Sequence, residues 1–259
     1  MKRWRYQLLR MSHNNYVLKE GAFLISDAHY SSKRPELLQL LKSIEAEELK
    51  TPQIVFMGDV FDLLFGHIPI TKERNRDAVN TINALAKKIE LIYLEGNHDF
   101  VLHKIFPDIH VISIEHQPLK CMYGDKKLSL AHGDYRGDWK YRLYLHVIRS
   151  PLILKFLNVI DTLTSHGIIR WLDAYLDKKN DCAVIEAFKK RMMRHRTLFE
   201  SYDCDYVIEG HFHQNCTIDF EEFEYINLGA FACNQRYFIV QSSEKQKLLR
   251  EVFFNKEII

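Results

Sequence analysis

The chain has 259 residues, of which 47% are hydrophobic and 27% charged, and its formal net charge at pH 7 is +2. This length and composition suit one large domain, or two small ones, with a buried core, and they exclude a disordered chain, a collagen-like chain, a coiled coil and a disulfide-stapled miniprotein. The near-neutral charge does not by itself indicate a nucleic-acid or membrane partner. The 13 histidines stand out, because imidazole is the commonest metal ligand in proteins.

Five short apolar runs of strand length recur along the chain, and each is followed directly by a polar cluster. These runs cover residues 22–25, 53–57, 91–94, 127–131 and 205–208. Apolar residues at helical spacing over 35–49 and 77–88 predict helices between the first runs, and therefore an α/β sheet. Three later runs predict an antiparallel continuation of the sheet: residues 222–227, 236–240 and 248–254.

Residues 135–200 interrupt this alternation and predict an inserted helical segment or lid within a single domain that spans residues 1–259. The segment holds 13 Lys and Arg against 7 Asp and Glu, which leaves 23 basic and 27 acidic residues elsewhere. A basic insert on a slightly acidic core is therefore expected. An apolar stripe at helical spacing predicts either a face that packs on the core or one that lines a lipid groove: Ile168, Trp171, Leu172, Tyr175 and Leu176.

The five cysteines lie at least a dozen residues apart and form neither a CxxC pair nor a zinc ribbon. We interpret them as reduced thiols that act as small apolar side chains in a cytoplasmic protein. The charged N-terminal segment lacks the apolar core of a secretory signal. The most apolar run, residues 151–160, is shorter than the about 20 residues that a membrane span needs.

The polar clusters are expected to meet in one crevice, because the loops at the carboxyl ends of parallel strands converge. Their imidazole, carboxylate and amide groups suit borderline divalent metals such as Mn, Fe, Co or Zn. There are more donors than one ion can use, and enough for two with a bridging carboxylate. The side chains of the clusters are Asp27, His29, Asp59, Asp62, Asn97, His98, Asp99, His132, Asp134, His211 and His213.

The ordered motifs D-x-H, G-D-x-x-D, G-N-H-D, H-G-D and G-H-x-H resemble those of the calcineurin-like metallophosphoesterase family over roughly residues 21–230. The resemblance implies an α/β sandwich, with two mixed β-sheets flanked by helices and a helical lid insertion. It implies a first metal site and a second one that share the bridging carboxylate of Asp59. The first consists of Asp27, His29, Asp59 and His213, and the second of Asp59, Asn97, His132 and His211.

The same resemblance implies that His98 stabilises the transition state or protonates the leaving oxygen, and that Asp99 orients the His98 imidazole. Two neighbouring cations lower the pKa of a shared water molecule and neutralise charge on phosphoryl oxygens. Asp62 and Asp134 either assist in a similar way or close their turns. Mn²⁺ is the expected activating ion, with Fe, Co or Zn as alternatives.

Within this family, the chain is most similar to the UDP-2,3-diacylglucosamine pyrophosphatases of bacterial lipid A synthesis, by its length, its insert after H-G-D and the Asn-Leu-Gly after G-H-x-H. The resemblance implies water attack on the α-phosphorus, to give UMP and 2,3-diacylglucosamine 1-phosphate, with the acyl chains under the insert. The implied substrate contacts are Asn97, His98, Asp138, Tyr141, Lys178, Lys179 and His211. His98 stands where the best-known branch has arginine, so either a divergent branch with the same reaction or a hydrolase of another phosphodiester fits.

The insert combines apolar and cationic side chains, as binding of a nucleotide-sugar lipid and of an anionic membrane surface would require. The basic residues between 189 and 196 are predicted either to contact lipid or to form a solvated helix face. We expect a cytoplasmic enzyme peripherally associated with the inner face of the cell membrane, with no nucleic-acid partner and no obligate protein partner. Two alternatives remain: a metallophosphodiesterase for another nucleotide, cyclic nucleotide or nucleic acid, and a metal-free binding scaffold.

Overall fold

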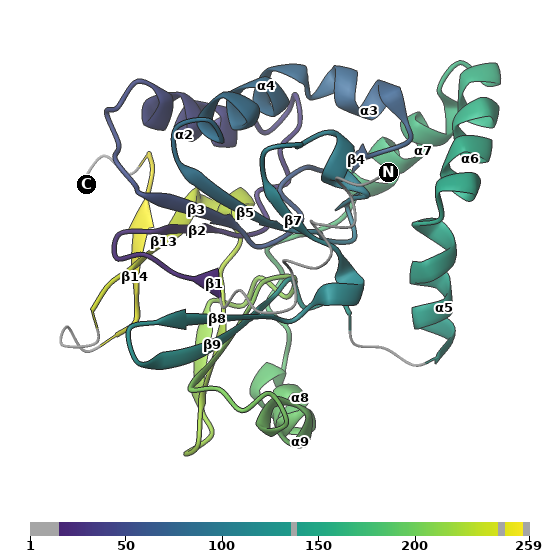
Figure 1. Cartoon of the computed structure of the whole chain (residues 1–259). Coiled ribbons are helices and arrows are strands. Elements are labelled where there is room, and N and C mark those ends of the chain that lie inside the picture. The colour runs from purple at the N-terminus through teal and green to yellow at the C-terminus, as the bar shows by residue number, and fades with distance from the viewer. Residues whose placement is uncertain (1–15, 136–138, 243–246, 256–259) are drawn as a thin grey trace, which may run out of the picture.

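The computed structural model describes residues 16–135, 139–242 and 247–255, which form two six-stranded sheets with helices on their outer sides (Figure 1). The first sheet consists, in spatial order, of β1 (Tyr16–Val17), β8 (Leu119–Tyr123), β9 (Lys126–Ala131), β10 (Tyr206–Glu209), β12 (Glu224–Asn227) and β11 (Cys216–Asp219). The second consists of β14 (Leu249–Phe253), β13 (Arg236–Val240), β2 (Phe23–Ile25), β3 (Gln53–Phe56), β5 (Glu90–Leu94) and β7 (His110–Ile112). The expected α/β sandwich of two mixed sheets is confirmed.

Parallel pairing of β2, β3 and β5 aligns the ends of these strands at one edge of the second sheet. The expected antiparallel continuation is right for β13, which pairs in that direction with both β14 and β2. For β12 it is right on one side only, because β12 lies antiparallel to β11 but parallel to β10. The reason is that β11 lies at the sheet edge and runs back antiparallel to β12, so β12 enters between β10 and β11 in the direction of β10.

Alternating side chains of the second sheet build two cores, one on each face. Leu24 and Val55 pack between the sheets, together with Leu130 and Ile208 of the first sheet. Their neighbours along β2 and β3 pack under α2 (Glu36–Glu45) and α4 (Arg76–Leu85), which cover the outer face, and α3 (Pro69–Arg74) precedes α4 on the same side (Figure 1). Since both faces are buried, the loops at the strand ends rest on a rigid base.

The remaining short elements lie between these strands or close to their ends. β4 (Leu64–Phe65) and β6 (Asp99–Phe100) form a small parallel pair. Two 3₁₀ turns cover Leu102–Lys104 and Ile114–His116. The four-residue helix α10 (Phe231–Asn234) precedes β13.

Among the described residues between β9 and β10 there are five helices, within the segment where the sequence predicts a helical insert. They are α5 (Trp139–Ile148), α6 (Pro151–Leu163), α7 (Gly167–Leu176), α8 (Phe188–Met193) and α9 (Arg196–Glu200). Figure 1 shows α5 to α7 beside the sandwich and α8 and α9 below the first sheet, where Phe188 and Phe199 pack against Tyr225. We therefore call α5 to α7 alone the lid. The assignment of residues 1–259 to a single domain stays a prediction.

Within the described ranges, no single helix is long and apolar enough to cross a membrane. α5 and α6 reach that length and composition only together, and they are bent by 62° at the break between them.

Two of the five cysteines are joined in a disulfide. Cys182, in the segment after α7, is bonded to Cys233 of α10, with 5.7 Å between their Cα atoms. The expectation of five reduced thiols is therefore wrong for this pair, because 51 residues separate the two cysteines in sequence and only the fold brings them together. Cys121 is a buried thiol, and Cys204 and Cys216 are half-buried thiols.

Candidate metal centre

The seven residues that the sequence predicts as metal ligands lie just beyond the carboxyl ends of five strands. They follow β2, β3, β5, β9 and β10: Asp27, His29, Asp59, Asn97, His132, His211 and His213. Four of them are almost fully buried: Asp27, His29, Asp59 and His132. The two sheets together therefore position the candidate centre.

One group of donors consists of Asp27, His29 and His213, whose ligand atoms all lie within 4.8 Å of one another. Nε2 of His213 is 3.0 Å from Oδ1 of Asp27. Burial opposes a charge on His213, but Asp27 outweighs this effect and raises the pKa of His213 to about 9. The buried Asp27 carboxylate therefore favours positive charge beside it, which a bound cation would also supply.

A second group consists of Asp59, His132 and His211, again within 4.8 Å. Nε2 of His132 is 3.3 Å from Oδ2 of Asp59 and 3.4 Å from Oδ1 of Asn97. Burial and the neighbouring His132 lower the pKa of His211 to about 3, so His211 is neutral, the form that binds metals. Burial opposes ionisation of Asp59, but His132 and other imidazoles hold its pKa well below the usual value.

The donors in this centre fit a pair of divalent cations. Nε2 of His29 and Nδ1 of His211 have no hydrogen-bond partner among the described residues, although these atoms are buried, and Nδ1 of His29 lies 3.3 Å from Oδ1 of Asp62. Burying such nitrogens without a partner is unfavourable, and a bound cation removes the penalty. Carboxylate, imidazole and amide oxygen are also the donors that borderline divalent metals accept.

The backbone of the centre adopts conformations that side chains rarely tolerate. Five of the expected ligands have φ between 46° and 62°: Asp27, His29, Asp59, His211 and His213. Such left-handed residues are strained and cluster at functional sites. Two motif glycines permit close approach, since a Cβ on Gly58 would lie 2.4 Å from Nδ1 of His132 and one on Gly96 would lie 2.2 Å from Oδ1 of Asp59.

His98 lies beside both groups of donors. Its Nε2 is 3.9 Å from Oδ2 of Asp59, and its Nδ1 donates a 2.9 Å hydrogen bond to the backbone carbonyl of Asp62. Together with His29 and Asp62 it forms a third set of donor atoms within 4.8 Å. Burial lowers the pKa of His98. The Asp62 carbonyl therefore fixes the ring so that Nε2 faces the centre.

Asp99 does not orient His98, so the role expected for it is wrong. Its carboxylate accepts hydrogen bonds from the backbone N–H groups of Asp59, Val60, Phe61 and Gly96, and from the Tyr93 hydroxyl. The two residues are adjacent in sequence, but side chains of successive residues in extended backbone point in opposite directions. Asp99 instead ties the G-N-H-D loop to the G-D-x-x-D loop, and thereby positions Asp59.

An apolar cavity of about 490 Å³ opens beside His98, between the lid and the β4–β6 pair. Asn97, His98 and Lys179 lie on its wall, and most of its other lining residues are apolar. All five residues of the predicted apolar stripe line this cavity: Ile168, Trp171, Leu172, Tyr175 and Leu176. The lid therefore forms one wall of an open apolar cavity that reaches the metal centre.

A family model described as "Calcineurin-like phosphoesterase" matches residues 23–215. The chain belongs to this family. A UDP-2,3-diacylglucosamine hydrolase of Psychromonas ingrahamii is 24% identical over 243 residues, which cover 89% of this chain and 97% of that protein. One from Pseudomonas syringae pv. tomato is 29% identical over 160 residues, covering 58% and 61%. A solved archaeal phosphodiesterase has a TM-score of 0.47 and 15% identity, covering 90% of this chain and 99% of that one.

As a calcineurin-like phosphoesterase, the chain is a metal-dependent hydrolase whose donors can bind divalent ions. Of the expected substrate contacts, Asn97, His98 and Lys179 line the cavity, and His211 lies in the metal centre. Tyr141 and Lys178 are described but do not line the cavity. Asp138 lies outside the described residues.

Sequence reasoning missed Arg149, a buried side chain that connects the lid to the loops of this phosphoesterase. Its Nη2 donates a 2.9 Å hydrogen bond to the carbonyl of Gly96 and lies 3.3 Å from Oδ2 of Asp134. Its guanidinium also lies over the ring of Phe100. The one signal in the sequence is an arginine within an otherwise apolar stretch of the insert.

Proposed function

We propose that this phosphoesterase hydrolyses the pyrophosphate bond of UDP-2,3-diacylglucosamine at the α-phosphorus, releasing UMP and 2,3-diacylglucosamine 1-phosphate. The observation that carries the proposal is the position of the cavity, whose apolar walls meet Asn97 and His98 at the metal centre. A diacylated nucleotide sugar requires both an apolar slot and a phosphate-hydrolysing centre. Relatives named UDP-2,3-diacylglucosamine hydrolase support this assignment.

Burial of acyl chains in this cavity supplies the selectivity for a lipid substrate. Each buried methylene contributes about 0.8 kcal/mol. Four buried methylenes therefore contribute roughly 3 kcal/mol, more than a hundredfold in affinity. A volume of about 490 Å³ lies within the range of ligand pockets and accommodates more than four methylenes.

We assign one metal to Asp27, His29, Asp59 and His213 and the other to Asp59, Asn97, His132 and His211, with Mn²⁺ as the activating ion. Two bound cations would supply an activated water molecule and neutralise charge on phosphoryl oxygens. In its imidazolium form, with Nδ1–H donated to the Asp62 carbonyl, His98 then donates a hydrogen bond or a proton through Nε2 to a phosphoryl or leaving oxygen. Lys179, on the cavity wall, offsets negative charge on the pyrophosphate.

We also propose that the protein is cytoplasmic and associates peripherally with the inner face of the cell membrane through α6. A stripe at helical spacing on this helix is between 55% and 80% exposed: Leu152, Phe156, Val159 and Leu163. Such an exposed apolar face is typical of an interfacial helix. Binding to vesicles that contain anionic lipid, lost when Phe156 and Leu163 become serine, tests this placement. Unchanged binding would contradict it.

The basic residues of 189–196 support lipid contact less well. They lie on or beside α8 and α9, which Figure 1 places away from the lid. Arg191 lies over the ring of Phe212, and Arg196 pairs with Glu200 and Glu222. Two of these cations thus have partners within the protein, as expected for a solvated helix face.

Hydrolysis of UDP-2,3-diacylglucosamine in water labelled with heavy oxygen tests the proposed reaction. The label is expected in UMP, because the attack is on the α-phosphorus. Its exclusive appearance in the sugar phosphate would overturn that assignment. If the protein left this lipid intact but hydrolysed a soluble phosphodiester, His98 in place of the arginine would mark a different substrate.

A further inference from the structure

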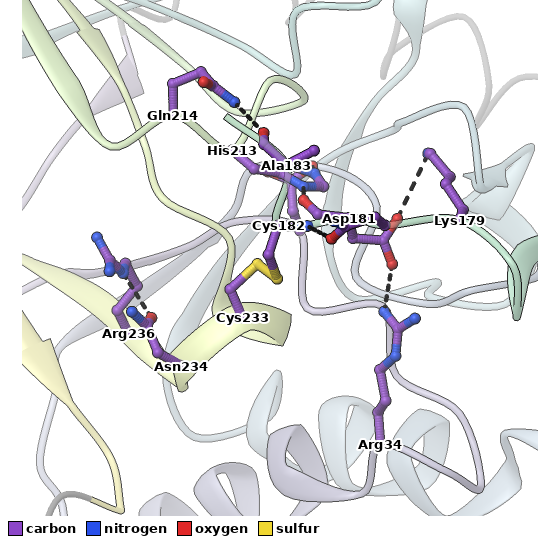
Figure 2. Close-up of a disulfide and its surroundings, with 12 residues drawn as sticks. Arg34, Lys179, Asp181, Cys182, Ala183, His213, Gln214, Cys233, Asn234 and Arg236 are labelled. Carbon is purple, nitrogen blue, oxygen red and sulfur yellow. Dashed lines mark hydrogen bonds and ion pairs between the residues drawn. A yellow bond between two sulfur atoms is a disulfide. The ribbon is translucent and has the colours of Figure 1, made fainter. Parts of the chain in front are cut away.

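The segment that follows the lid, residues 179–185, passes back over the metal centre. Figure 2 shows Asp181 beside His213, and the backbone carbonyl of Asp181 accepts a hydrogen bond from Nδ1 of His213. The other ring nitrogen, Nε2, lies 3.0 Å from Oδ1 of Asp27. The partner of the nitrogen that does not bind metal fixes the tautomer and the ring orientation of a histidine ligand. Asp181 therefore determines where Nε2 of His213 points.

Two cations in turn hold the side chain of Asp181, which is only 7% exposed. Its Oδ2 is 2.8 Å from Nη1 of Arg34, in the loop beyond the D-x-H motif, and its Oδ1 is 3.7 Å from Nζ of Lys179. Figure 2 shows both contacts. Asp181 thus connects the core, the cavity wall and a metal ligand.

The disulfide attaches this segment to a second support of the same group of donors. Cys182 is bonded to Cys233 of α10 (Figure 2). The backbone N–H groups of Phe231 and Ala232, at the start of α10, donate to the carbonyl oxygens of Ser26 and Asp27. One covalent bond therefore joins the neighbour of Asp181 to the turn that holds the backbone of Asp27.

We propose that Asp181 is a positioning residue for His213 and that the Cys182–Cys233 disulfide holds it in place, so that metal retention depends on the redox state of the disulfide. The inference rests on the metal centre and is independent of the lipid substrate. Reduction by a water-soluble phosphine breaks the S–S bond and forms two thiols. The phosphine gives up two electrons and takes the oxygen of water, which supplies both protons.

The first test measures Mn²⁺ loss from the loaded full-length protein to a competing chelator, before and after phosphine treatment and desalting under nitrogen. For about half of the bound Mn²⁺, the affinity is expected to fall roughly 10- to 100-fold after reduction, the range for loss of a ligand's outer partner. A C182S/C233S variant should show this lower affinity without phosphine, while C204S should retain Mn²⁺ as the wild type does. Equal retention in both redox states, or peptide mapping that finds Cys182 and Cys233 as thiols in the purified protein, would overturn the proposal.

The second test separates positioning of His213 from general attachment of the lid. Asp181→Ala removes both ion pairs and should weaken retention of one Mn²⁺ about tenfold. Asp181→Asn retains an oxygen acceptor for Arg34 and should recover most of the loss. Asp177→Ala removes the exposed pair with Lys33, which does not reach His213, and should leave retention unchanged. An equal loss in the Asp177 and Asp181 variants would show that the segment only anchors the lid.

Discussion

The metal centre and the lid differ in burial and in backbone geometry. The centre holds buried side chains on left-handed backbone, braced by hydrogen bonds such as those to Asp99. The lid exposes large apolar side chains, among them Leu152 at 77% and Leu163 at 80%, and buries few, among them Leu154 and Ile169. Under the proposed function, this difference means that the core provides chemistry usable on any phosphodiester, whereas the lid selects the substrate. Variants that affect only one region test this division.

The largest effect is expected from Asp59→Asn, which removes the carboxylate shared by the two donor groups. Turnover of lipid and soluble substrates alike should fall by more than about a thousandfold, roughly 4 kcal/mol of transition-state stabilisation. Steady-state kinetics with both substrates measures it. Asp125→Asn, at a side chain that is 87% exposed, is the control and should behave as wild type. A variant at Asp59 with near-normal turnover would refute the metal assignment.

His98→Ala should lower kcat about a hundredfold with either substrate, because proton or hydrogen-bond donation contributes about 10²- to 10⁴-fold. Its metal content should match that of the wild type, as measured by elemental analysis. Loss of one metal ion would instead show that His98 is a ligand. The donor atoms of His29, Asp62 and His98 lie close enough together to share an ion.

Leu157→Gln should weaken binding of the lipid substrate without affecting the metal centre, since Leu157 lines the cavity. Placing an amide there disfavours acyl-chain burial, and KM for the lipid substrate should rise about tenfold, near 1.4 kcal/mol. Leu163→Gln, on the same helix but 80% exposed, is the matched control in detergent solution. Equal losses with the lipid and with a soluble phosphodiester would mean that Leu157 supports the fold and not the substrate.

Asp161→Asn should have the smallest effect, on stability of the lid. The buried Asp161 carboxylate accepts hydrogen bonds from His166 and from the backbone of Ile169 at the start of α7. Burial opposes its charge, but the His166 hydrogen bond and the backbone amides outweigh burial and lower the pKa of Asp161. At pH 7 the variant should lose about 1–2 kcal/mol of unfolding free energy.

The lowered pKa of Asp161 determines how the stability loss in the variant depends on pH. Because the pKa of Asp161 is lower in the folded state, its stabilisation is present above the ordinary carboxyl pKa near 4 and disappears as the pH falls through the folded value. Urea unfolding of wild type and variant should therefore converge below about pH 4. A difference that stays constant with pH would contradict this role.

The clustering of the seven expected ligands could be predicted from sequence because each follows a strand-length apolar run, and strand ends converge in this type of sheet. The role of Asp99 could not, since adjacency to His98 in sequence hides the opposite directions of the two side chains. Asp181, Arg149 and the disulfide were also missed. Their partners lie 32, 53 and 51 residues away, and no local periodicity marks such pairs.

The most direct test of this division is the ratio of kcat/KM for UDP-2,3-diacylglucosamine to that for UDP-N-acetylglucosamine, which carries no long acyl chain. With Mn²⁺ the wild type should prefer the lipid more than about a hundredfold, as expected from burying several methylenes in the cavity. Leu157→Gln should reduce this preference while Asp59→Asn abolishes both activities. Equal kcat/KM values for the two substrates would contradict a lid that selects lipid.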